Sequence, residues 1–171
     1  MKVIFLDIDG PIATRWSQMN TLLEVPYGHS HVPFDRQAVR ALNFIIESTG
    51  AVIVLSSAWR CIYPFIELKE MFMNGGIHGL LLGKTPESKP LSVRGLEIQL
   101  YMSDLPFRDK IESFVIIDDD VHDILPYFPN NTLACYALDG ITMEIANKAI
   151  SILNGVTNDE TKKERAVSKI S

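Results

Sequence analysis

Aspartates occur in two clusters, and each cluster directly follows an apolar run. Asp7 and Asp9 come after the run at residues 3–6, and three consecutive aspartates at 118–120 come after the run at residues 113–117. Burying a charged side chain beside a strand costs free energy unless the charge is paired or binds a metal ion. Carboxylate oxygens are hard ligands that favour Mg²⁺, which binds one or two of them together with water and phosphate oxygens. The two clusters therefore predict a magnesium site, provided that the fold brings them together.

The elements that would position these clusters are short apolar stretches that alternate with stretches of helical spacing. The apolar stretches, which we expect to be strands, lie at residues 3–6, 51–55, 77–82, 113–117 and 131–138. The helical stretches lie at residues 35–50, 64–73, 92–102 and 142–153. Fully apolar strands separated by helices are typical of parallel sheets. This order predicts an α/β fold, a Rossmann-like three-layer sandwich in which a five-stranded parallel sheet carries helices on both faces.

The strand at residues 3–6 should lie in the centre of this sheet, beside the strands that precede Ser56 and Asp118. Ligands of open parallel sheets bind beyond the carboxyl ends of the strands, so Asp7, Ser56 and Asp118 are expected to meet at one edge. The simpler alternative is that each acidic residue caps the turn or helix after its own strand. That alternative suffices for one aspartate alone, but a shared cation explains better why several stand at corresponding strand ends.

Composition and charge limit the classes of protein to consider. The chain has 171 residues, of which 47% are hydrophobic and 22% are charged, as in an ordinary globular protein. The formal net charge of −5 predicts that the surface as a whole does not attract nucleic acid, although a local basic patch would. The sequence has neither a signal-peptide pattern at its start nor an apolar run of membrane-spanning length, so we expect a soluble, cytoplasmic protein. The pattern predicts one domain at residues 1–155 and a charged tail or linker at 156–171, and it leaves the oligomeric state open.

Three short motifs carry a resemblance to a known superfamily. The sequences "DIDG" at 7–10, "VIVLSS" at 52–57 and "VIIDDD" at 115–120 resemble motifs one, two and four of the haloacid dehalogenase (HAD) superfamily of aspartate phosphatases. The runs "SSAWR" at 56–60 and "GKTP…RGLEI" at 83–98 are similar to the HAD domain without a cap that is described in Swiss-army-knife RNA repair proteins. The resemblance covers residues 1–155.

The resemblance implies a role for each residue of motif one. Asp7 would be the nucleophile that forms an aspartyl phosphate, and Asp9 would act as general acid and then as general base. The backbone carbonyl of Asp9 would also bind the metal, and Gly10 would allow the sharp turn behind it. The expected Mg²⁺ ligands are Asp7, Asp9, Asp118 and Asp119.

The phosphoryl group needs further partners, and the resemblance implies them as well. Ser56 would donate a hydrogen bond from its hydroxyl, although a role as helix N-cap is an alternative that is compatible with it. Motif three requires one Lys or Arg, and the chain offers Lys84, Lys89 and Arg94; we favour Arg94 because its guanidinium suits bidentate phosphate contact. The cations that do not take this role would be solvated loop charges. The predicted phosphate-binding set is Gly10, Ser56, Ser57, Lys89 and Arg94.

Access to the site should be open, because neither residues 10–33 nor the segment after Ser57 has room for a cap domain. Residues 10–33 lack a clear period and are expected to form a long loop or flap. Trp16, Trp59 and Arg60 follow motifs one and two and would line the mouth, where a base or a phosphotyrosine ring could stack. Packing of Trp59 beneath the flap is an equally simple alternative.

These features predict a Mg²⁺-dependent phosphatase that acts through an aspartyl-phosphate intermediate. An open site suits a macromolecular substrate, either a phosphoprotein, including phosphotyrosine, or a polynucleotide end. One alternative is a small nucleotide or sugar phosphate. Another is a binding module with this fold and no activity; its usual mark would be loss of the nucleophile, and Asp7 is present.

Overall fold

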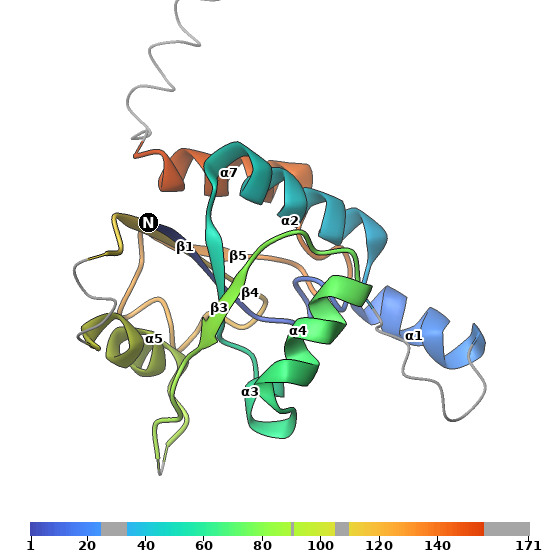
Figure 1. Cartoon of the computed structure of the whole chain (residues 1–171), viewed down its shortest axis with the longest axis horizontal. Helices are drawn as coiled ribbons and strands as arrows, with labels where there is room; N and C mark the ends of the chain where they lie inside the picture. Colours follow the sequence, from blue (N-terminus) through green and yellow to red (C-terminus); the bar gives the residue numbers. More distant parts are fainter. Residues whose placement is uncertain (25–33, 90, 105–109, 156–171) are drawn as a thin grey trace, which may run out of the picture.

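The computed structural model describes residues 1–24, 34–89, 91–104 and 110–155 (Figure 1). Its centre is a five-stranded sheet in the order β3-β2-β1-β4-β5, and all neighbouring strands are parallel. The strands are β1 (Lys2–Leu6), β2 (Val52–Leu55), β3 (Leu81–Lys84), β4 (Ser113–Asp118) and β5 (Thr132–Ala134). The predicted parallel α/β sheet with β1 in its centre is confirmed.

The strand register brings the ends of the three central strands to one level. Leu6 of β1 pairs with Leu55 of β2 on one side and with Ile117 of β4 on the other. The residues that follow each of these positions are Asp7, Ser56 and Asp118. The sheet therefore aligns the first aspartate of each cluster with the serine that follows β2.

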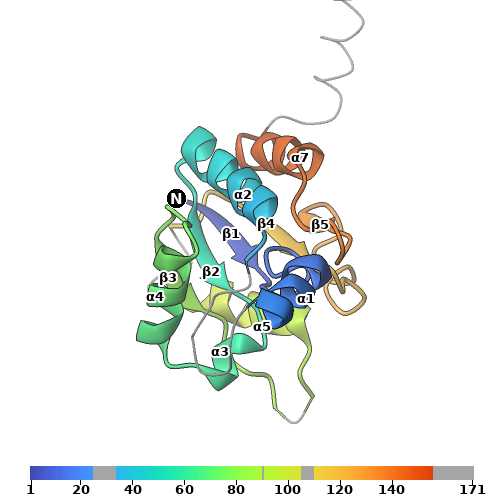
Figure 2. The ribbon, with the colours of Figure 1, turned by 90° about the vertical axis from the view of Figure 1, so that its right-hand side faces the viewer.

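Helices cover both faces of the sheet (Figure 2). On one face lie α2 (Arg36–Thr49), α4 (Phe65–Asn74) and α7 (Met143–Leu153), which share a core with alternate strand residues such as Ile4 and Ile53. On the opposite face α5 (Arg94–Ser103) packs Ile98 and Tyr101 against Val3 and Phe5. The alternation of the buried strand residues between two cores explains why the central strands are apolar except at their ends.

Helix α2 begins and ends where its sequence predicts. Oδ1 of Asp35 accepts hydrogen bonds from Gln37 N at 2.8 Å and from Ala38 N at 3.0 Å. Gly50 ends the helix in the left-handed region, with φ of 66°. An N-cap carboxylate and a C-terminal glycine satisfy backbone groups that the helix itself leaves unpaired.

The segment after motif one differs from the predicted loop, because residues Arg15–Glu24 form helix α1. Oγ1 of Thr14 accepts a hydrogen bond from Ser17 N at 3.0 Å and so satisfies the first turn. The apolar residues of α1 follow no strong helical period, which is why the sequence pattern does not predict it. The remainder of the expected flap, residues 25–33, lies outside the described residues.

Three further elements differ from the prediction, and the first is β3, which covers Leu81–Lys84 rather than the stretch at 77–82. A four-residue helix, α3 (Trp59–Ile62), follows motif two, and β5 occupies only Thr132–Ala134 of the apolar stretch at 131–138. After β5 the chain turns back, with Gly140 N donating to Tyr136 O at 2.9 Å. The predicted tail or linker at 156–171 lies outside the described residues.

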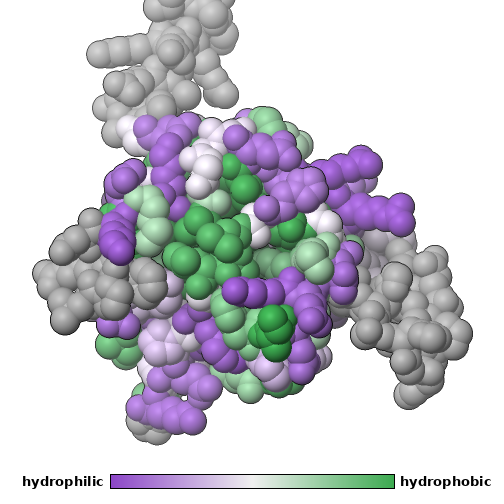
Figure 3. Space-filling model, in the orientation of Figure 1, coloured by the Kyte–Doolittle hydropathy of each residue, from purple (hydrophilic) through white to green (hydrophobic). Residues whose placement is uncertain are grey.

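Apolar side chains gather on the face of the molecule that carries β2 and β3, and hydrophilic residues surround them (Figure 3). Leu80, directly before the edge strand β3, is 58% exposed. Its carbonyl oxygen accepts a hydrogen bond from Ile53 N at 2.9 Å, so backbone pairing holds this residue at the surface.

Among the described residues, none of the helices combines the length and the apolar character needed to cross a membrane.

Candidate active site

Three polar residues stand at the carboxyl ends of the central strands and are almost completely buried. Asp7 is 4% exposed, and Ser56 and Asp118 are inaccessible to solvent. Backbone pairing continues past the strands, since Asp7 N donates to Ile117 O at 3.0 Å and Ser56 N donates to Leu6 O at 2.8 Å. The sheet itself therefore fixes the positions of Asp7 and Ser56.

The carboxylates of Asp7, Asp118 and Asp119 form one cluster. One oxygen of each lies within 4.8 Å of the corresponding oxygens of the other two. Burial raises the pKa of Asp118 to about 7, and the charge of Asp7 adds to this shift. Burial also raises the pKa of Asp7, although the nearby Arg94 opposes the increase. The cluster therefore favours binding of a cation or a proton.

Gly10 allows the turn after motif one to contact this cluster. Its φ is 90°, in the region that favours glycine. A Cβ atom at this position would lie 2.4 Å from Cγ of Asp119. Any side chain at position 10 would therefore force Asp119 or the turn itself to shift.

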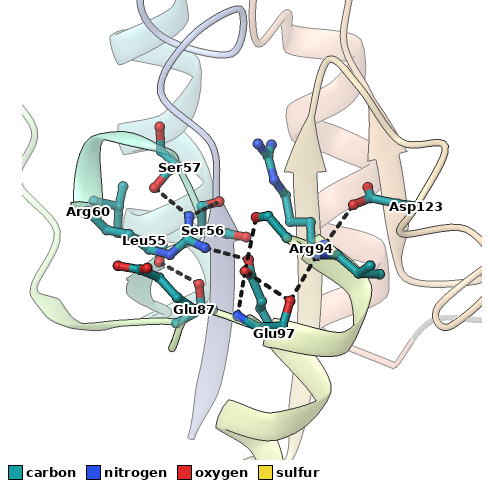
Figure 4. A network of polar contacts seen from close by, with 12 residues as sticks. Leu55, Ser56, Ser57, Arg60, Glu87, Arg94, Glu97 and Asp123 are labelled. Atoms are coloured by element: carbon teal, nitrogen blue, oxygen red, sulfur yellow. Dashed lines mark hydrogen bonds and ion pairs between the residues drawn. The ribbon is translucent and has the colours of Figure 1, made fainter. Parts of the chain in front are cut away.

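The guanidinium group of Arg94 contacts two of the three carboxylates. Its Nη1 lies 3.2 Å from Oδ2 of Asp7 and 2.5 Å from Oδ2 of Asp118. In Figure 4 the Arg94 side chain extends from the start of α5 and points away from Glu97. The single charge of Arg94 thus lies between the predicted nucleophile and a predicted metal ligand.

The two other cations considered for motif three lie elsewhere. Nζ of Lys84 donates to the carbonyl oxygen of Arg60 at 2.7 Å. The side chain of Lys89 is 82% exposed and forms an ion pair with Glu87 at 3.2 Å. Within the described part of the chain, Arg94 is the cation that the structure brings to the carboxylate cluster.

A fourth aspartate holds the helix that carries Arg94. Oδ2 of Asp123 accepts a hydrogen bond from the backbone N of Arg94 at 2.7 Å (Figure 4). A Cβ atom on Gly95 would lie 2.6 Å from the carbonyl oxygen of Asp123, so the glycine permits this close approach. The sequence pattern does not predict this contact, because it joins residues that are 29 positions apart.

The hydroxyl group of Ser56 is buried and has no hydrogen-bond partner among the described residues. An unpaired buried hydroxyl carries an energetic cost that a ligand oxygen would remove. The alternative that Ser56 caps a helix does not match the geometry, because Ala58 precedes α3 and makes no side-chain cap. The neighbouring Ser57 donates its hydroxyl to Asp7 and lowers the pKa of that carboxyl against the larger effect of burial.

The carboxylate of Asp9 is exposed and interacts with two N–H donors outside the cluster. Its Oδ2 accepts a hydrogen bond from Nε1 of Trp59 at 2.7 Å, and its Oδ1 accepts one from Nε2 of Gln18 at 3.1 Å. The Trp59 ring also packs against Phe34 and Tyr63, with ring centroids 6.4 Å and 5.3 Å away. Trp59 therefore combines packing with a direct contact to the predicted general acid.

Two residues predicted at the mouth have different environments. Trp16 on α1 is 61% exposed. Arg60 instead is 5% exposed and forms an ion pair with Glu97, at 2.5 Å between Nη2 and Oε2. The prediction that Arg60 lines the mouth is therefore corrected: α3 turns its side chain inward, where a buried carboxylate balances its charge.

An open pocket includes in its lining Arg94, which contacts the cluster. It is lined by Ser92, Arg94, Asp120, His122 and Asp123. Of the three consecutive aspartates, Asp118 and Asp119 belong to the cluster, whereas Asp120 lies beside this pocket.

Comparison with known proteins yields one match. Residues 3–146 match the model of a family described as the HAD domain in Swiss Army Knife RNA repair proteins. No curated protein and no solved structure matches the chain.

Proposed function

The chain belongs to the family of HAD domains in Swiss Army Knife RNA repair proteins, and we propose that it is a Mg²⁺-dependent phosphomonoesterase. The observation that carries the proposal is the contact of Arg94 with both Asp7 and Asp118 at the ends of adjacent strands. A nucleophilic carboxylate and a phosphoryl group are both anionic, so they can approach each other only where positive charge is fixed in advance. Arg94 supplies part of that charge.

The carboxylate cluster fits a magnesium ion. Mg²⁺ prefers oxygen ligands at about 2.0–2.1 Å in octahedral geometry, so two of its ligands lie up to about 4 Å apart. The oxygens of Asp7, Asp118 and Asp119 are grouped within 4.8 Å. We propose that these three side chains hold the ion. The backbone carbonyl of Asp9, which the resemblance of motif one implies as a ligand, would complete the set of protein ligands. A bound Mg²⁺ would neutralise charge on the oxygens of the transferring phosphoryl group.

The first proposed step transfers the phosphoryl group to the protein. A carboxylate oxygen of Asp7 attacks phosphorus, and the bond between phosphorus and the ester oxygen breaks. Asp9 gives its proton to the departing oxygen, which leaves as an alcohol. The products of this step are the free alcohol, an aspartyl phosphate at Asp7 and an ionised Asp9.

The second proposed step returns Asp7 to its free form. A water molecule attacks phosphorus while Asp9 takes up a proton from it, and the bond between phosphorus and Asp7 breaks. Inorganic phosphate leaves, and Asp9 again carries the proton that the next cycle requires. In both steps Arg94 and the hydroxyl of Ser56 would hold the phosphoryl oxygens.

We propose a polynucleotide phosphate end as the substrate. The description of the family, which names RNA repair proteins, supports this class. The exposed ring of Trp16, at 61% exposure, offers a surface on which a base could stack. A phosphoprotein is the second candidate, because the formal net charge of −5 gives no overall attraction for a polyanion.

The experiment that tests this proposal is hydrolysis of p-nitrophenyl phosphate, with and without Mg²⁺, followed by a substrate panel. The panel contains oligonucleotides phosphorylated at the 3′ or the 5′ end, phosphopeptides including phosphotyrosine, nucleotides and sugar phosphates. We expect Mg²⁺-dependent release of phosphate and the highest kcat/KM on an oligonucleotide end. A higher kcat/KM on a phosphopeptide would transfer the assignment to the second candidate, and no turnover of any of these substrates would reject a phosphatase.

A further inference from the structure

The ion pair between Arg60 and Glu97 joins the two segments that carry the phosphate-binding candidates (Figure 4). Arg60 lies four residues after Ser56, and Glu97 lies one helical turn after Arg94 in α5. The side chains of the pair are 4% and 1% exposed, so water does not compete for their contact. We propose that Arg60 and Glu97 are positioning residues, which fix the distance between Ser56 and Arg94 and thereby set how well the site holds a phosphoryl group. The catalytic part of this inference rests on the proposed function.

The arginine holds the loop that follows β2. Its Nη1 donates hydrogen bonds to Ser57 O at 2.8 Å and to Ser56 O at 3.5 Å, so the guanidinium folds back over its own segment. The carbonyl oxygen of Arg60 in turn accepts a hydrogen bond from Nζ of Lys84 on β3 at 2.7 Å. The guanidinium of Arg60 thus holds the motif-two loop, while the backbone of Arg60 is bound to β3 at the edge of the sheet.

The glutamate holds the segment that leads into α5. Its Oε1 accepts hydrogen bonds from Ser88 N at 3.0 Å, from Ser88 Oγ at 3.2 Å and from Ser92 Oγ at 3.2 Å. Together with Asp123, which accepts from Arg94 N, it fixes the start of α5 at two points. Its Oε2 forms the ion pair with Arg60, which completes the link between the loop after β2 and the helix.

Stability alone does not explain a charged pair at this place. Removing two charges from water offsets most of their attraction, and well-packed apolar residues often replace such a pair without loss of stability. Moreover, Nε of Arg60 is buried and has no partner among the described residues. The other side-chain bonds of the pair lead to Ser56, Ser57 or the segment that leads into α5, so its distinctive contribution is geometrical.

The test uses the double variant Arg60→Met/Glu97→Gln. Both charges disappear together, and the glutamine oxygen still accepts from Ser88 and Ser92, so neither partner is left as an unpaired buried charge. We expect kcat on p-nitrophenyl phosphate to fall about ten- to hundredfold with a smaller change in KM, as small displacements of catalytic groups do. Affinity for inorganic phosphate with Mg²⁺, measured by calorimetry, should fall as well, while the melting temperature stays within a few degrees of wild type.

The matched control is Glu144→Gln, which removes the carboxylate from an exposed ion pair with Lys148 on α7. It should change neither kcat nor phosphate affinity. A second comparison repeats the double change in an Arg94→Ala background, where we expect less than about a threefold further loss, because residues that act through one partner are not additive. An equal loss in both backgrounds, or unchanged phosphate affinity in the double variant, would overturn the inference.

The phosphate measurement separates this inference from the proposed function. A wild-type chain that binds phosphate but hydrolyses no ester would reject the phosphatase, and the effect of the double variant on phosphate binding would still decide the role of the pair. A wild-type chain that does not bind phosphate in the presence of Mg²⁺ would contradict both.

Discussion

The indole nitrogen of Trp59 lies 2.7 Å from Oδ2 of Asp9, across 50 positions of sequence. This hydrogen bond joins the short helix after β2 to the predicted general acid after β1. Gln18 of α1 donates to the other oxygen of the same carboxylate at 3.1 Å. The orientation of Asp9 therefore depends on two segments that contribute nothing to the carboxylate cluster.

Trp59→Phe should lower kcat by about tenfold, because a hydrogen bond to a charged group contributes on the order of 1.5 kcal/mol. The phenyl ring still packs against Phe34 and Tyr63, so the melting temperature should change little. Tyr63→Phe, which removes only a hydroxyl from the neighbouring ring, is the control and should leave kcat unchanged. Equal activity of Trp59→Phe and wild type on a phosphomonoester with a poor leaving group would show that Asp9 does not need this donor.

Arg94→Ala should lower kcat by about 10²–10³, the usual effect of losing one contact that stabilises charge in the transition state. Arg94→Lys should remain well below wild type, because an ammonium group cannot make the bidentate contact that a guanidinium makes with a phosphoryl group. The rates of Lys84→Ala and Lys89→Ala, measured on one substrate at saturating Mg²⁺, complete the comparison. If Lys89→Ala were inactive and Arg94→Ala retained normal activity, Lys89 and not Arg94 would be the cation of motif three.

Gly10→Ala should destabilise the protein by about 1–3 kcal/mol, because alanine is strained at a φ of 90° and its Cβ would collide with Asp119. Gly76→Ala is the matched control, since Gly76 has a φ of 78° but nothing within 4 Å of the added atom. Urea unfolding of both variants separates the two contributions. If Gly76→Ala lowers the free energy of unfolding as much as Gly10→Ala does, the clash of the added Cβ with Asp119 contributes nothing to the loss.

The stability of the metal-free protein should depend on pH through Asp118. Burial raises its pKa from 3.8 to about 7 in the folded state, so folding favours the protonated form. The stability that this proton confers is complete below pH 3.8 and is lost as the pH rises through 7. Thermal unfolding in EDTA should therefore show that Asp118→Asn gains stability relative to wild type between pH 5 and pH 8. A difference that does not vary with pH would contradict the raised pKa.

Addition of Mg²⁺ should reverse this dependence. The ion requires ionised carboxylates, so its binding displaces the proton and stabilises the protein more at pH 8 than at pH 6. The melting temperature with excess Mg²⁺ minus that with EDTA should accordingly increase over this range. A constant difference would argue that the ion binds away from Asp118.

The central part of the fold could be predicted because it follows from local patterns. Fully apolar strands separated by helices specify a parallel sheet, and a parallel sheet must bring Asp7, Ser56 and Asp118 to one edge. The guanidinium of Arg94 favours this residue for motif three, and the structure places that group against Asp7 and Asp118. Metal binding and catalysis by these residues stay predictions.

The contacts that the sequence did not predict are long-range ones between polar side chains. The position of Arg60 after motif two predicts that it lines the mouth of the site, but Glu97, 37 positions later, allows it to be buried. Apolar periodicity does not predict helix α1, whose first turn is capped locally by Thr14. A distant partner therefore decides the position of Arg60, whereas α1 begins at a local cap that apolar periodicity does not reveal.

The most direct test of the proposed mechanism is detection of a phosphorylated Asp7. The Asp9→Asn variant is mixed with p-nitrophenyl phosphate and Mg²⁺, quenched, treated with borohydride and analysed by peptide mass spectrometry. The leaving group needs no proton, whereas the hydrolysis of the intermediate does need the base, so the aspartyl phosphate should accumulate and be reduced to homoserine at position 7. Homoserine at another aspartate, or none at position 7 under conditions in which nitrophenol is released, would contradict Asp7 as the nucleophile.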